Sequence, residues 1–106
     1  MKLQDYIFRK EIVKQLYKVI DPELFISIVD LGLIYDIIIK RKERKIIITI
    51  TLTTIGCPLS ATIEKQIRQN IDILKSTFNL DILIVFDPPW SPQMISPSAR
   101  AELGIE

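Results

Sequence analysis

The chain has 106 residues, of which 48% are hydrophobic and 25% are charged, values typical of a folded globular protein and not of a disordered one. At this length we expect a single domain spanning residues 1–106. Lysine and arginine number 14 against 13 aspartates and glutamates, so a net charge of +1 gives no general attraction to nucleic acid. No apolar run reaches the length of a membrane span, and we expect neither a membrane nor a nucleic-acid partner.

The sequence contains one cysteine, Cys57, and no histidine. A single cysteine forms no intrachain disulfide, and no secretory leader is recognisable, so we expect a reducing, cytoplasmic location. The absence of histidine excludes Cys-His and Ser-His-Asp catalysis and every zinc site that uses histidine. Hydrolases of the thiol-protease type are therefore excluded.

Residues 6–20 have the apolar spacing of an amphipathic helix, and we expect it to stop at Pro22, because the residue before a proline disfavours helical backbone. The turn that follows carries two carboxylates, Asp21 and Glu23. In the structural interpretation Asp21 accepts hydrogen bonds from the turn backbone while Glu23 is solvated. In the functional interpretation both carboxylates face Cys57 as hard ligands or proton acceptors. Local sequence alone favours the structural interpretation.

An irregular, core-packed connection over residues 25–32 is predicted next, and residues 33–40 and 45–53 then form a predicted β-hairpin. The dense basic run between the two strands is typical of a solvated hairpin tip. One face of the second strand carries the threonines, and we expect this face to be half-exposed. Of these threonines and their neighbour in the turn, only Thr53 and Thr54 lie close to Cys57 in sequence. The core face of the second strand consists of alternate residues, Ile46, Ile48, Ile50 and Leu52.

Cys57 lies in the turn between this strand and a second helix. With Pro58 at the first helical position, Cys57 becomes the N-cap residue, where free N–H groups and the helix dipole favour the thiolate and lower the thiol pKa. Gly56 allows a sharp turn and the close approach of a ligand. Ser60 is a competing N-cap, and a free cysteine is often simply buried. The turn therefore supports a reactive or metal-binding sulfur and an inert one about equally.

From Pro58 to Leu74 apolar residues recur at helical spacing, and this helix leads to a third predicted strand over residues 80–86. Such a βαβ unit crosses over right-handed and leaves its two strands parallel. Ligands in these units bind beyond the carboxyl ends of the strands. Cys57 is expected there, because it lies in the turn that follows the second strand.

The loop after the third strand runs from Asp87 to Pro92 and contains Trp90, which we expect to pack on the core as a rigid lid near Cys57. Ser96 as N-cap and Gly104 as C-cap define a short final helix. The predicted fold is thus a small α+β domain in the order α-β-β-α-β-α, with a mixed three-stranded sheet and helices packed on it. The place of the third strand beside the first or the second is left open.

Four segments of the chain form a characteristic series: Asp21-Pro22-Glu23-Leu24, residues 28–36 (IVDLGLIYD), residues 51–58 (TLTTIGCP), and residues 87–92 (DPPWSP) followed by Met94-Ile95-Ser96. In this order they resemble the SufT/PaaD-like family of iron–sulfur cluster assembly factors. Two positions depart from the usual family pattern: Phe25 stands where glycine is usual, and Ile55 where proline is often found. Both departures alter backbone stiffness beside the predicted site.

The resemblance implies a compact α+β domain with a mixed sheet and no established catalytic turnover, which matures iron–sulfur proteins or delivers clusters to them. It implies partners among the iron–sulfur assembly machinery and apo client proteins, and iron or an iron–sulfur cluster held transiently by Cys57. It also implies a functional site centred on that thiolate. The site consists of Cys57, Asp21, Glu23, Thr53 and Thr54, with Pro22, Gly56, Pro58, Asp87 and Trp90 at its rim.

Three functional hypotheses follow. Iron–sulfur clusters usually take four thiolate ligands and one chain supplies one, which favours transfer or adaptor function, since a stable cluster needs a homodimer, carboxylates or a partner protein. A thiol-based redox enzyme is the second, although the chain has no resolving cysteine and no histidine base. A non-catalytic interaction module with an inert Cys57, docking through Trp90 and nearby apolar residues, is the third.

Overall fold

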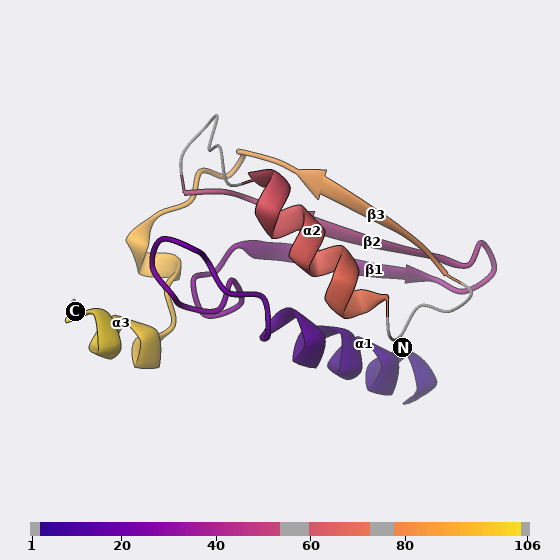
Figure 1. The fold of residues 1–106 in the computed structure, drawn as a ribbon. Helices are drawn as coiled ribbons and strands as arrows, with labels where there is room; N and C mark the ends of the chain where they lie inside the picture. The colour runs from indigo at the N-terminus through magenta and orange to yellow at the C-terminus, as the bar shows by residue number, and fades with distance from the viewer. Residues whose placement is uncertain (1–2, 54–59, 73–77, 105–106) are drawn as a thin grey trace.

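The computed structural model describes residues 3–53, 60–72 and 78–104 (Figure 1). The observed order confirms the predicted sequence of helices and strands, with one short 3₁₀ helix in addition. The elements are α1 (Leu3–Leu16), β1 (Ile34–Lys40), β2 (Lys45–Ile50), α2 (Ser60–Ile71), β3 (Asn79–Ile84), η1 (Pro92–Met94) and α3 (Pro97–Leu103).

The three strands form one mixed sheet in the order β1-β2-β3. β1 and β2 form the predicted antiparallel hairpin, in which Lys40 pairs with Lys45 across an exposed four-residue tip. β3 lies parallel to β2, with Ile46 opposite Leu80, which answers the open question of strand order. Because β2 and β3 run in the same direction, the segments that leave their carboxyl ends start from the same edge of the sheet.

Helices α1 and α2 lie together over one face of the sheet (Figure 1), and the core fills the space between these two layers. The predicted alternation in the second strand is confirmed, since the four apolar residues at 46, 48, 50 and 52 are each no more than 5% exposed. The predicted apolar stripe of the second helix is also buried within its described part. The helices contribute Ile12, Leu16, Ile63, Ile67 and Ile71 to the core.

The first helix ends earlier than its apolar spacing predicts. α1 stops at Leu16, and the chain then tightens, because Val19 N–H bonds to the Leu16 carbonyl three residues back. Ile20, predicted to lie on the apolar face of the helix, instead pairs with Ser27 in an isolated antiparallel bridge and is 38% exposed. The reason is tertiary: the backbone of residues 19–28 satisfies its hydrogen bonds across its own loop rather than along the helix.

The threonine face of the second strand is more buried than predicted. Thr51 has no exposed surface, and within the described part of the chain its hydroxyl has no hydrogen-bond partner. β2 itself ends at Ile50, one residue earlier, and the Thr51 N–H instead bonds to the Leu33 carbonyl at 2.8 Å. The prediction of a half-exposed face holds for Ile47 and Thr49, but it is wrong at Thr51.

The final helix begins and ends where the sequence predicts. The Ser96 hydroxyl accepts a hydrogen bond from the Ala99 N–H at 3.3 Å, and Gly104 closes the helix in the left-handed conformation with φ of 74°. The chain reaches α3 through η1, and Ala99 anchors the helix in the core. Among the described helices, none combines the length and the apolar character needed to cross a membrane.

Candidate functional site

One open cleft of about 210 Å³ collects most of the predicted site residues that the structure describes. The turn after α1 supplies Asp21, Glu23 and Leu24, the segment after β2 supplies Thr53, and the segment after β3 supplies Trp90. Three stretches far apart in the sequence therefore meet at the edge where the parallel strands end. The family resemblance implied that Asp21, Glu23 and Thr53 gather around Cys57; these three line one cleft, and Cys57 lies outside the described residues.

The Asp21 carboxylate organises the turn that forms one wall of the cleft. Its Oδ1 accepts hydrogen bonds from the N–H groups of Glu23 at 2.8 Å and Leu24 at 2.9 Å. Asp21 is 7% exposed, whereas Glu23 is exposed to solvent. The structural interpretation of the two carboxylates is therefore confirmed, and Asp21 acts on the cleft by fixing its shape. Glu23 is the carboxylate that remains accessible to a ligand.

Phe25 closes this turn in a conformation that glycine adopts more easily. Its φ is 58°, and its N–H donates to the Asp21 carbonyl at 2.8 Å. Left-handed backbone is uncommon for a bulky side chain, which gives a physical reason for the glycine usual at this position. The Phe25 side chain is 79% exposed, and its neighbour Leu24, which lines the cleft, is 40% exposed. The lip of the cleft is thus apolar and open to solvent.

Trp90 is held against the core by its own polar group. The indole N–H donates a hydrogen bond of 2.7 Å to the Leu31 carbonyl, and the ring packs on the hydrophobic core. This confirms the prediction that Trp90 packs on the core, whereas its predicted nearness to Cys57 stays a prediction. Its exposed fraction is intermediate, so one part of the indole stays accessible to the cleft that it lines.

Further contacts join the segment around Trp90 to residues 30–35, and we call this set of contacts the clasp. The Tyr35 hydroxyl donates to the Pro88 carbonyl at 2.8 Å, and the Ser96 hydroxyl donates to Asp30 Oδ1 at 3.0 Å. The Ser96 N–H also donates to the Asp30 carbonyl at 2.7 Å. At Gly32, with φ of 77°, an added Cβ would lie 2.5 Å from the Met94 carbonyl oxygen. Only glycine lets the two segments approach this closely.

The clasp explains sequence features to which no role could be assigned from the sequence alone. Tyr35, Gly32 and Leu31 lie in the second resembling segment, and Met94 follows the fourth, yet their mutual contacts span about 60 positions of the chain. Leu24 was likewise missed as a wall of the cleft. The sequence signal was its position, since a leucine directly after Asp21-Pro22-Glu23 lies in an acidic turn, and the structure shows it 40% exposed.

The remaining predicted site residues divide into two groups. Pro22 and Asp87 are described, but neither is among the described residues that line the cleft, and Asp87 is exposed. Several others lie outside the described residues, namely Thr54, Gly56, Cys57 and Pro58. The predicted N-cap role of Cys57 and the predicted facing of the carboxylates toward its thiol therefore remain predictions.

In the described ranges 3–53, 60–72 and 78–104, no three Cys, Asp or Glu side chains gather closely enough to hold a metal ion. The chain as a whole has one cysteine and no histidine. The donor set therefore does not fit a resident cluster with four ligands from one chain.

A family model described as "Iron-sulfur cluster assembly protein" matches residues 9–79, which include the second half of α1, the hairpin, α2 and two of the three walls of the cleft. The chain belongs to this family. Its resemblance to the SufT-like assembly factors, first drawn from short segments, is thereby confirmed. The family model ends where β3 begins, so the Trp90 wall lies beyond the matched residues.

Individual relatives cover nearly the whole chain. The Fe-S protein maturation auxiliary factor YitW of Bacillus subtilis is 36% identical over 98 residues, 92% of this chain and 95% of the relative. The Fe-S protein maturation auxiliary factor SufT of Staphylococcus aureus is 37% identical over 82% of this chain and 98% of its own length. A crystal structure of a domain of unknown function from Bacillus anthracis has a TM-score of 0.85 at 34% identity and covers 95% of each chain.

Proposed function

We propose that this chain is an assembly or transfer factor that helps iron–sulfur client proteins to mature, and that Cys57 is its central thiolate. The observation that carries the proposal is its family membership, together with similarity over most of its length to two proteins named as Fe-S protein maturation auxiliary factors. In this role the chain binds cargo and partners without catalytic turnover of its own, in the cytoplasm.

The ligand count supports transfer rather than storage. A cluster bound to Cys57 has one thiolate from this chain, and a second copy adds only one more, so further ligands come from a scaffold, a client or carboxylates. Incomplete ligation by one chain keeps the cluster exchangeable, which suits a protein that must release its cargo. Iron and sulfide are thus the substrate of the process, and the apo client is the acceptor.

The residues of the cleft have different roles around the proposed thiolate. Thr53, on one wall, precedes Cys57 by four positions, so the proposed thiolate follows directly from the cleft in sequence. Glu23 is the accessible carboxylate of the cleft and is able to bind iron as a hard ligand or to accept a proton from a thiol. The apolar lip of Leu24 and Phe25 provides surface for a client or scaffold to bury when it docks.

The test is anaerobic reconstitution with ferrous iron and sulfide, comparing the wild type with Cys57→Ser. Visible absorption, iron per chain and mass in solution are measured, and each loaded sample is then mixed with an apo-ferredoxin as acceptor. We expect a chromophore that transfers to the ferredoxin in the wild type and is absent in Cys57→Ser. A well-folded wild type that takes up no iron would exclude a stand-alone carrier.

A cellular experiment tests the adaptor form of the same proposal. Deleting the gene should lower the activity of iron–sulfur enzymes relative to cluster-free enzymes, and the wild-type gene but not Cys57→Ser should restore it. Unchanged iron–sulfur enzyme activity in the deletion strain would overturn the proposed function. Consumption of peroxide by the purified chain with an external thiol would instead support the thiol redox enzyme.

A further inference from the structure

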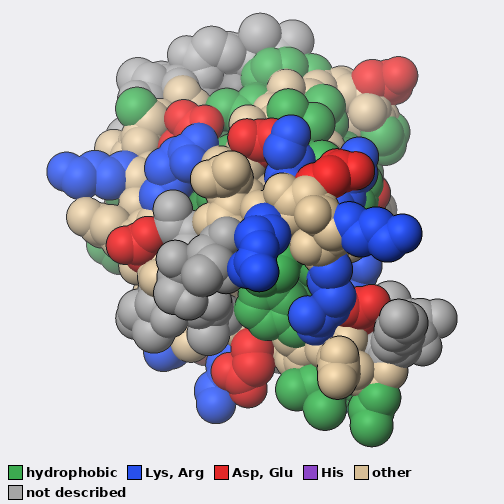
Figure 2. Space-filling view, turned by 90° about the vertical axis from the view of Figure 1, so that its right-hand side faces the viewer, with side chains coloured by type: hydrophobic (Ala, Val, Ile, Leu, Met, Phe, Trp, Pro, Cys, Tyr) green, Lys and Arg blue, Asp and Glu red, His purple; other side chains and the backbone are tan. Residues whose placement is uncertain are grey.

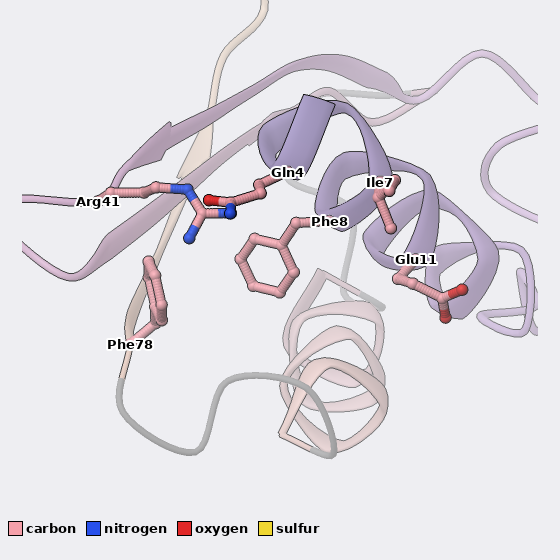
Figure 3. Close-up of a pocket in the computed structure, with 6 residues that line it drawn as sticks. All are labelled: Gln4, Ile7, Phe8, Glu11, Arg41 and Phe78. Carbon is pink, nitrogen blue, oxygen red and sulfur yellow. The ribbon is translucent and has the colours of Figure 1, made fainter. Parts of the chain in front are cut away.

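A second pocket lies at the other end of α1 from the candidate cleft, and none of the predicted site residues that the structure describes lines it. It has a volume of about 330 Å³ and is formed by the start of α1, the hairpin tip and the residue before β3 (Figure 3). Phe8 and Phe78 make its aromatic wall, with ring centroids 5.3 Å apart and planes at 51°. The lining residues are Gln4, Ile7, Phe8, Glu11, Arg41 and Phe78.

The surface beside this pocket projects large apolar side chains into solvent. Leu3 is 72% exposed, and Ile7, itself one of the lining residues, is 53% exposed; the two lie one helical turn apart on α1. Tyr6 adds a side chain that is 49% exposed. Leu3, Tyr6 and Ile7 thus form an apolar ridge next to the pocket. A two-fold axis can place the ridge of each copy over the pocket of the other.

The charges around the pocket favour a second copy of the same chain over a strongly charged macromolecule. Figure 3 shows Arg41 and Glu11 on opposite sides of the pocket, and Figure 2 shows basic and acidic side chains interspersed around hydrophobic surface at this end of the molecule. Arg41 already pairs with Asp5 and lies 5.8 Å from the centroid of the Phe8 ring. Its guanidinium has five N–H donors, enough for a second carboxylate.

These charges determine whether the α1 helices of two copies cross parallel or antiparallel. If two α1 helices cross in parallel, Glu11 faces Glu11 and Arg41 faces Arg41. If they cross antiparallel near Ile7, Glu11 of each copy, one helical turn beyond Ile7, moves toward the Arg41 end of the other. We propose that two copies of this chain associate through α1, antiparallel about a two-fold axis, with Ile7 of each copy over the aromatic pocket of the other. This dimer leaves both candidate clefts open, because they lie beyond the opposite end of α1.

Sedimentation equilibrium from 10 µM to 1 mM tests the proposal on the full chain. We expect the wild-type mass to rise from that of one chain, 12.3 kDa, toward that of two. Ile7→Glu should raise the dimer dissociation constant at least tenfold, because it places a charge over the aromatic pocket. Tyr17→Glu is the matched control, a large side chain 47% exposed just past the other end of α1, and should change that constant less than twofold.

Glu11→Arg gives a second readout that does not depend on the apolar core. It sets two cations against each other in the antiparallel dimer and should weaken the dimer several-fold, with an unchanged circular dichroism spectrum. A wild type that stays at the mass of one chain up to 1 mM overturns the proposal and leaves the pocket to a different partner. So does a dimer insensitive to both Ile7→Glu and Glu11→Arg, or an assembly larger than two chains, because the two-fold contact closes at two.

Discussion

The indole N–H of Trp90 bonds to the carbonyl oxygen of Leu31, a residue 59 positions earlier in the chain. This contact fixes one wall of the cleft to a segment that is itself fully buried at Leu31. The core therefore holds this wall of the cleft in place. Substitutions at residues that contact no ligand should then change both the stability of the fold and the geometry of the site.

Trp90→Phe should destabilise the fold by about 1–2 kcal/mol, because a smaller aromatic ring remains while the buried Leu31 carbonyl loses its donor. Urea unfolding followed by circular dichroism measures the effect, since the substitution removes the only tryptophan fluorophore. Tyr35→Phe, which removes the hydroxyl bonded to Pro88, provides a comparison on the same clasp. Unaltered stability in Trp90→Phe would mean that the hydrogen bond contributes nothing net.

Gly32→Ala should cost about 2 kcal/mol or more, because its Cβ must fit 2.5 Å from the Met94 carbonyl in addition to adopting φ of 77°. Gly104→Ala is a matched control with nearly the same backbone, φ of 74°, but nothing within 4 Å of the added Cβ. It should cost about 1 kcal/mol, from backbone strain alone. Equal losses of stability in the two variants would show that the close approach of Met94 is relieved without cost.

Phe25→Gly should stabilise the fold by about 0.5–1 kcal/mol, because relief of the left-handed strain exceeds the flexibility that glycine adds to the unfolded chain. Phe25→Ala keeps the strained backbone and removes the exposed ring, so it should leave stability nearly unchanged. The midpoint of thermal unfolding distinguishes the two. A stabilising alanine would place the effect in the ring rather than in the backbone.

Asp21→Asn should leave stability within about 0.5 kcal/mol of the wild type, because the amide oxygen still accepts from the Glu23 and Leu24 N–H groups. Asp21→Ala removes that acceptor and should cost about 1–2 kcal/mol. Comparing the two variants in iron reconstitution separates shape from charge. Iron uptake retained in Asp21→Asn and lowered in Asp21→Ala assigns Asp21 to shaping the turn, whereas loss in both assigns a role to its carboxylate charge.

The elements that the sequence predicts well are those set by local chemistry. Ser96 and Gly104 mark the ends of α3 because a side-chain cap and a left-handed glycine act within a few residues. The buried alternation of β2 and the stripe at Ile63, Ile67 and Ile71 follow from the periodicities of strand and helix. The turn role of Asp21 is equally local, since its partners are two and three residues away.

The features that the sequence does not predict depend on distant partners. The apolar spacing continues through Val19 and Ile20 and predicts a longer helix. The chain instead leaves α1 at Leu16, because the backbone of residues 19–28 forms its hydrogen bonds across its own loop. The burial of Thr51 likewise depends on tertiary packing, which the alternation of residues along the strand does not reveal. For the site, local chemistry located the acidic turn, but the convergence of that turn with Thr53 came from family resemblance rather than spacing.

The clasp also sets the order in which a newly made chain can complete its site. The hairpin of β1 and β2 joins neighbouring segments, so its pairing requires no residue beyond 50. The bonds from Trp90 and Ser96 to Leu31 and Asp30 require almost the entire chain. During synthesis the cleft therefore gains its third wall last, and a nascent chain that ends before residue 90 lacks the complete site.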